Sequence, residues 1–171
     1  GDPSEWLLTY PGILRQQHKG AGVGLVNSSP EIDGIVRRVP LVVSSSGKLF
    51  PSFALEMLRV GVGDPSYQIK TEETGVEWLR IPNFPLIKTD SNARVWITNN
   101  IKFYRQSAAE YLREPLEGAA FVIAGVTAEG VVNPVPTASG AVYPHEVQAN
   151  VLHHLINGTS PVQPVWSDVA E

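Results

Sequence analysis

Apolar residues along this chain gather into short runs separated by glycine, proline and polar residues, a pattern that predicts many short elements. Residues 20–27 (GAGVGLVN) and 35–43 (IVRRVPLVV) are typical of strands that flank the loop 28–34, and together they predict a hairpin-like unit. Pro40 has no N–H to donate to a ladder, so the second strand is expected to lie at a sheet edge or to break there.

Three segments are predicted to be helical. Residues 51–60 (PSFALEMLRV) repeat apolar side chains at helical spacing, and glycines follow them as a stop signal. Residues 107–115 (SAAEYLREP) predict a short helix that Ser107 caps. The longest helix is predicted from residue 144 or 145 to residue 157, and Gly158 ends it.

The longest strongly apolar run is residues 119–126 (AAFVIAGV), which is far shorter than the roughly 20 residues that a membrane span needs. An unbroken apolar run is typical of a strand covered on both faces, as in the centre of an α/β sheet. Further strands are predicted at 67–71, 76–82 and 93–99. The alternation of elements predicts an α/β (or α+β) layered sandwich, a mixed β-sheet with a buried central strand and flanking helices.

Composition limits the classes of function. The chain is 43% hydrophobic and 18% charged, which suits one globular domain with a core of its own. A net charge of −4, with only 13 lysines and arginines, argues against a nucleic-acid-binding protein. The chain has no cysteine, which removes disulfides, thiolate metal sites and cysteine nucleophiles.

Known catalytic and cofactor motifs are missing from the sequence. The segment GAGVG (20–24) has G-x-G-x-G spacing and leads into a strand, whereas a dinucleotide fingerprint has G-x-G-x-x-G before a helix. Tight turns explain these glycines better. His153 and His154 point about 100° apart on a helix and cannot both bind one ion there. With no G-x-S-x-G elbow either, we expect no catalytic residue, no metal and no cofactor.

The last predicted helix carries a regular polar stripe. Glu146, Asn150, His153 and Asn157 follow one another at i, i+4, i+7 and i+11, and therefore share one face. This stripe is either a solvated face of an amphipathic helix or the polar wall of an interface or pocket. On the second interpretation, Glu146 and Asn150 are candidate ligand-binding residues.

Two adjacent arginines, Arg37 and Arg38, interrupt an otherwise apolar predicted strand. Strand alternation places them on opposite faces, and a guanidinium on an apolar surface needs a carboxylate or carbonyl partner. Asp33 and Glu31 are near in sequence, and Glu146 is a distant alternative. The pair is either a structural ion pair that braces the hairpin or a bidentate anion clamp, which makes both arginines candidate ligand-binding residues.

Four motifs in a fixed order, over roughly residues 20–158, resemble the second type of CHASE domain (cyclases/histidine kinases associated sensory extracellular). They are GLVNSSPEIDGIVRRVPLV (24–42), PSFALEML (51–58), LEGAAFVIAGVTAEG (116–130) and PHEVQANVLHHLING (144–158). The matching positions are Asp33, Gly34, Arg37, Arg38, Pro40, Leu41, Pro51, Ser52, Gly118, Gly125, Ala128, Glu146, Ala149, Asn150 and Gly158. The chain departs from the family pattern at Ala119, Asn133, His145 and Gln148, where the family has lysine, aspartate, glycine and histidine.

The resemblance implies a non-enzymatic, extracytoplasmic sensory module of a bacterial transmembrane signalling receptor, such as an adenylate or guanylate cyclase, a histidine kinase or a Ser/Thr kinase. It implies an unidentified small-molecule or environmental stimulus, no nucleic acid, a membrane tether in the parent protein and, as an option, a homodimer. The family domain is longer at its N-terminus, so residues 1–171 are expected to be one domain that corresponds to its C-terminal two-thirds. The alternatives are a solute-binding or cell-envelope interaction domain without signalling output, and a hydrolase whose triad assembles in space.

Overall fold

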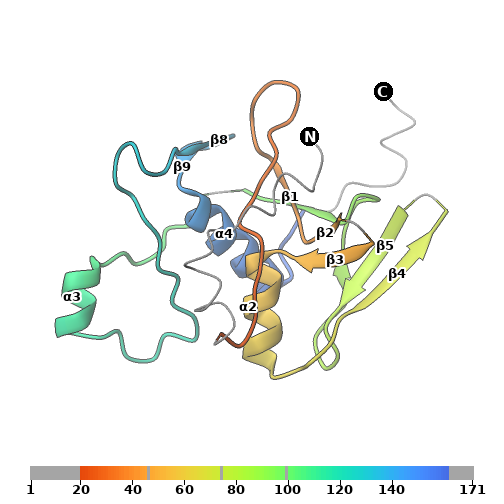
Figure 1. Cartoon of the computed structure of the whole chain (residues 1–171), viewed down its shortest axis with the longest axis horizontal. Coiled ribbons are helices and arrows are strands. Elements are labelled where there is room, and N and C mark those ends of the chain that lie inside the picture. Colours follow the sequence, from red (N-terminus) through yellow and green to blue (C-terminus); the bar gives the residue numbers. More distant parts are fainter. Residues whose placement is uncertain (1–19, 46, 74, 99, 162–171) are drawn as a thin grey trace.

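The computed structural model of the chain describes residues 20–45, 47–73, 75–98 and 100–161. Within these residues it has an α+β fold, which confirms the predicted class (Figure 1). The helices α2 and α4 lie in the middle of the molecule, with α3 toward one end and the β4–β5 hairpin toward the other (Figure 1). The elements in chain order are β1 (Arg38–Pro40), β2 (Val42–Ser45), β3 (Lys48–Pro51), α2 (Phe53–Val62), β4 (Gln68–Glu72), β5 (Gly75–Arg80), β6 (Ile87–Lys88), β7 (Arg94–Trp96), α3 (Ala108–Arg113), β8 (Val135–Thr137), β9 (Gly140–Val142) and α4 (Pro144–Asn157).

The strands form small antiparallel sheets instead of one mixed sheet. The pairs are β1 with β7, β2 with β3, β8 with β9, and the three-stranded meander β4–β5–β6. The predicted strand 35–43 breaks at Pro40, as expected for a residue without an N–H, and continues after Leu41 as β2. Its predicted hairpin with residues 20–27 is wrong, because Arg38 faces Trp96 of β7 in the register.

Residues 20–27 instead run beside the start of α2. Leu25 forms a parallel bridge to Ser52, and its N–H donates to the carbonyl of Pro51 over 2.9 Å. A Cβ at Gly22 would lie 1.8 Å from the Glu56 carboxylate, and one at Gly24 would lie 2.4 Å from the Cα of Phe53. Close approach to the helix, and not a tight turn, therefore requires these two glycines.

The prediction of a buried central strand at residues 119–126 is wrong. The segment forms no strand, and Val122 and Val126 are 47% and 52% exposed. Phe121 and Ile123 do pack against the core, and the Phe121 ring sits where a Cβ at Gly61 of α2 would be. An apolar run becomes a strand only where neighbouring strands supply hydrogen bonds, and within the described residues no strand pairs with this segment.

The hydrophobic core lies where the α2–α4 pair meets the strands. Fully buried side chains come from α2 and α4, from β1, β5 and β7, and from the residues directly after β1 and β5. They include Val39, Leu41, Leu55, Leu79, Ile81, Val95, Val147 and Val151. Gln148 of α4 is also fully buried, and its Oε1 accepts a hydrogen bond from the Ala54 N–H over 3.0 Å. Because Ala54 lies in the first turn of α2, Gln148 satisfies a donor that the helix itself cannot pair.

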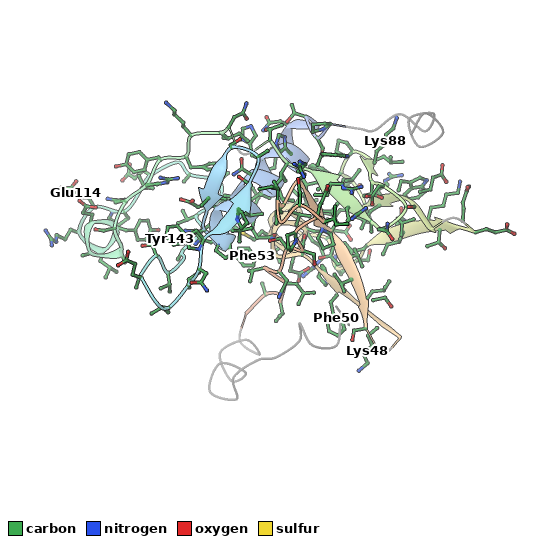
Figure 2. The ribbon with its side chains drawn as sticks, turned by 90° about the horizontal axis from the view of Figure 1, so that it is seen from above. Lys48, Phe50, Phe53, Lys88, Glu114 and Tyr143 are labelled. Atoms are coloured by element: carbon green, nitrogen blue, oxygen red, sulfur yellow. The ribbon has the colours of Figure 1, made fainter. Side chains whose placement is uncertain are left out.

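The helix α3 takes no part in this core. None of its residues is buried, and Ser107 and Glu110 form a capping box that stabilises it locally. Figure 2 shows Glu114, at the end of α3, far from Phe53 at the start of α2. The same view shows Lys48 and Phe50 of β3 pointing away from the centre on a different side of the molecule (Figure 2).

Candidate functional site

The loop before β1 places Asp33 where it pairs with Arg37. Asp33 Oδ1 accepts a hydrogen bond from the Ile35 N–H over 3.1 Å, and Gly34 takes the left-handed conformation that the turn needs, with φ of 81°. Arg37 then donates from Nη1 and Nη2 to the two oxygens of Asp33, over 3.0 Å and 2.7 Å. This bidentate hydrogen bond from Arg37 lowers the pKa of Asp33.

Arg38 lies on the opposite face of the strand, as the alternation predicts. Its Nε donates to Glu31 Oε1 over 2.8 Å, and its Nη1 lies 3.4 Å from Asp90 Oδ2. The guanidinium also sits over the ring of Trp96, 5.1 Å from the ring centroid. Glu31 bridges the two arginines, since its Oε2 lies 3.5 Å from Arg37 Nη1.

Asp90 is a part of this cluster that the sequence reading missed. Its Oδ1 accepts hydrogen bonds from the N–H groups of Asn92 and Arg94, over 3.0 Å and 2.9 Å. Its Oδ2 accepts a third from Arg94 Nε over 2.8 Å, besides facing Arg38. An aspartate followed by Ser-Asn is a turn signature, and that signal could have marked Asp90 as a structural centre.

A hollow of about 620 Å³ lies beside this cluster. Its size falls in the range of small-molecule sites, roughly 300–1,000 Å³. The wall combines guanidinium, carboxylate, amide and apolar groups, among them Glu31, Arg38, Pro40, Val42, Asn92 and Arg94. Of the two candidate arginines, therefore, Arg38 borders the hollow, while Arg37 does not line it.

The polar stripe of α4 lies elsewhere and is partly covered by the preceding segment. Glu146 Oε1 pairs with Arg105 Nη2 over 2.8 Å, so its suggested pairing with Arg37 or Arg38 is wrong. Asn150 is buried, and its Nδ2 donates to the Glu146 carbonyl over 2.9 Å. Phe103 meets the ring of His153 edge-on, with 6.3 Å between ring centroids. No contact among the described residues joins Glu146 or Asn150 to Arg37 or Arg38.

The buried histidine of α4, His154, is another residue that the motif search did not single out as functional. Its Nε2 lies 3.4 Å from the donating N–H of Thr98 and 3.1 Å from Thr98 Oγ1, and its Nδ1 lies 3.0 Å from Thr159 Oγ1. Burial, and then the neighbouring His153, lower the pKa of His154. The neutral ring thus links Thr98, which follows β7, to Thr159, which follows α4.

A second hollow, of about 370 Å³, lies between α2 and residues 21–24 and 120–121. Glu56 in its wall accepts hydrogen bonds from Arg59 Nε over 2.9 Å, from Arg59 Nη2 over 2.6 Å and from the Tyr67 hydroxyl. Although burial favours the protonated acid, these bonds lower the pKa of Glu56. Burial, and then the hydrogen bond to Glu56, raise the pKa of the Tyr67 hydroxyl. The charged groups of this cluster are therefore the Arg59 guanidinium and the Glu56 carboxylate.

Two kinds of feature are absent from the part of the chain that the structure describes. Within it, no group of three histidine, aspartate or glutamate side chains could hold a metal ion. Nor does any helix there have the length and apolar character of a membrane span.

The fold and the hollows define the class of protein first. The described part of the chain is a small α+β unit with two hollows whose volumes fall in the range of small-molecule sites. The chain belongs to the CHASE2 family, because the family model of the CHASE2 domain matches residues 7–171. This family consists of extracellular sensory domains of signalling receptors and is not catalytic. Neither the curated proteins nor the solved structures gave a match.

Proposed function

We propose that this chain is the extracytoplasmic sensory module of a bacterial transmembrane receptor whose output domain is a nucleotide cyclase, a histidine kinase or a Ser/Thr kinase. The family match over residues 7–171 carries the proposal, because CHASE2 domains are sensory. The module would detect its stimulus outside the cytoplasm, without chemistry of its own, while a membrane tether in the parent protein connects it to the output domain.

The proposal is supported by contacts of β7 that connect the larger hollow to the residues that follow α4. Arg38 borders the hollow and lies over the Trp96 ring, and Ser160 Oγ donates to the Trp96 carbonyl over 3.1 Å. Residues that follow α4 therefore touch the same strand as the hollow. A ligand that binds two arrangements of Arg38 with different affinity would shift the position of β7, and with it the segment around Ser160.

The test is the architecture and output of the parent protein. We expect its gene to encode membrane helices next to a cyclase or kinase domain. In membranes that contain the full-length parent, Ser160→Ala should change the basal cyclase or kinase activity, whereas Ser139→Ala, which removes a comparable hydroxyl-to-carbonyl bond at Thr98, should not. A parent that is a soluble cytoplasmic enzyme would contradict the proposal. A membrane-bound parent without an output domain would favour a solute-binding role instead.

A further inference from the structure

The larger hollow is bordered by guanidinium groups with hydrogen-bonding capacity left over. Arg94 donates from Nε to Asp90, and within the described residues its two terminal nitrogens have no acceptor. Arg38 uses Nε and Nη1, while its Nη2 has no acceptor in the same part of the chain. The side chains of Arg94 and Arg38 are 30% and 22% exposed, so these donors are neither fully solvated nor fully paired.

The carboxylates around the hollow, by contrast, are already engaged. Asp90 receives hydrogen bonds at both carboxylate oxygens, and Glu31 faces Arg37 and Arg38 with both of its own. A positively charged ligand would therefore meet two arginines and no vacant carboxylate. A ligand with acceptor oxygens would instead accept hydrogen bonds from the unpaired guanidinium nitrogens. The planar guanidinium group of an arginine matches the geometry of a carboxylate.

Charge balance disfavours a ligand with two negative charges. The two arginines of the wall, Arg38 and Arg94, are neutralised by Glu31 and Asp90, so the site has no surplus of positive charge. A dianion such as a phosphate monoester would add two charges near two carboxylates. A monocarboxylate adds one, and it could engage the unused Nη donors without displacing either existing ion pair.

Besides its charged and polar side chains, the wall has an apolar part. Pro30, Ile32, Pro40 and Val42 line the hollow, and Ile32 is fully exposed at the tip of its loop. An apolar group that covers the exposed side chain of Ile32 would remove apolar surface from water, and this burial would stabilise the complex. The ligand should thus carry a short hydrocarbon body next to its charged group.

We propose that this hollow binds an amphipathic monocarboxylate, with its carboxylate against Arg94 and Arg38 and its apolar body against Pro40, Val42 and Ile32. This inference deepens the proposed sensory function, because it names the chemical class of the ligand. Binding is nevertheless measured on the isolated 171-residue chain and needs no signalling output.

The experiment compares four probes by calorimetric titration and by thermal shift. Hexanoate has both required features, acetate lacks the hydrocarbon body, hexanol lacks the charge and hexylammonium reverses it. We expect hexanoate to bind and to raise the melting temperature, since a ligand of the folded state stabilises it by mass action. The other three should bind far more weakly.

Three variants locate the site. Arg94→Gln should weaken hexanoate binding about ten- to a hundredfold, the loss expected for one charge-assisted hydrogen bond. Ser44→Asp places a negative charge on an exposed wall residue without touching an ion pair, and should also weaken it. Arg80→Gln, at an exposed position on β5 outside the wall, is the matched control and should bind like the wild type.

Several results would overturn the proposal. These are no hexanoate binding at millimolar concentration, equal binding of hexylammonium, or unchanged binding in folded Arg94→Gln and Ser44→Asp. The melting temperature of each variant without ligand shows whether it is folded. Failure here removes the ligand class and leaves the sensory role intact, because that role is tested by the architecture and output of the parent protein.

Discussion

At the scale of single residues, His154 shows how burial selects a protonation state. Its Nε2 faces the donating N–H of Thr98, so that nitrogen serves as an acceptor and the ring is neutral. Burial, followed by His153, lowers the pKa of His154 below its ordinary value of 6.5. As the pH falls below about 6.5, His154 is therefore protonated in the unfolded chain before it is protonated in the folded chain.

This difference predicts the direction of a pH dependence. The contribution of His154 to stability is complete above its unfolded pKa and is lost as the pH falls toward its lower folded pKa. Urea unfolding between about pH 7.5 and about pH 5.5 should show this loss in the wild type, with a smaller loss in His154→Gln. Asn157→Gln, at the exposed last position of the same helix, changes no titratable group, is the control and should keep the wild-type slope. Equal slopes for the wild type and His154→Gln would contradict the assignment.

Residue-level reasoning succeeded where the interaction is local in sequence. Strand alternation predicts opposite faces for Arg37 and Arg38, and the nearby Asp33 and Glu31 do pair with them. The role of Asp90 could not be predicted from alternation, because it lies 52 residues away from Arg38 and meets it only through the pairing of β1 with β7. Whether any of the four candidate residues binds a ligand stays a prediction.

At the scale of elements, two serine-capped helices, α2 and α3, differ in how they are coupled to the core. Ser52 Oγ accepts from the Leu55 N–H over 3.2 Å at the start of α2, whose Ala54, Leu55 and Leu58 are buried. Ser107 Oγ accepts from the Glu110 N–H over the same distance, but α3 buries no residue. The same capping bond should therefore contribute differently to global stability.

We expect Ser52→Ala to lower the free energy of unfolding by about 1 kcal/mol, the usual cost of losing an N-cap. Ser107→Ala should change it by less than about 0.5 kcal/mol, because α3 can fray without opening the core. Denaturant titration followed by tryptophan fluorescence would measure both. A large loss in Ser107→Ala would show that α3 is docked to the rest of the molecule.

Helices were predictable here and the sheet was not. The predicted ranges 51–60, 107–115 and 144–157 overlap α2, α3 and α4, because caps and a 3.6-residue period are written in the local sequence. Strand candidates at 67–71, 76–82 and 93–99 overlap β4, β5 and β7. The partners of a strand are not local, and for this reason the failures were the pairing of 20–27 and the buried strand at 119–126.

At the scale of the whole molecule, the segment 119–126 leaves an apolar run on the surface. Half of Val126 and nearly half of Val122 are exposed, while Phe121 turns inward to Gly61. Within the described residues, no backbone-to-backbone hydrogen bond involves this run. Short, uncharged segments rich in β-branched residues with unpaired backbone groups are templates for strand pairing between molecules.

These features predict that the isolated chain self-associates through residues 119–126. Val122→Lys should lower the average mass at high protein concentration, because a buried lysine at a strand-to-strand contact would lose its hydration. Val131→Lys is the control, since Val131 is 69% exposed and lies outside the run. Sedimentation velocity over a range of protein concentrations distinguishes the two variants. If the wild type remains a monomer throughout, or if both lysine variants associate as the wild type does, the run is not the contact. In that case the exposed apolar side chains of 119–126 remain in contact with water in the monomer.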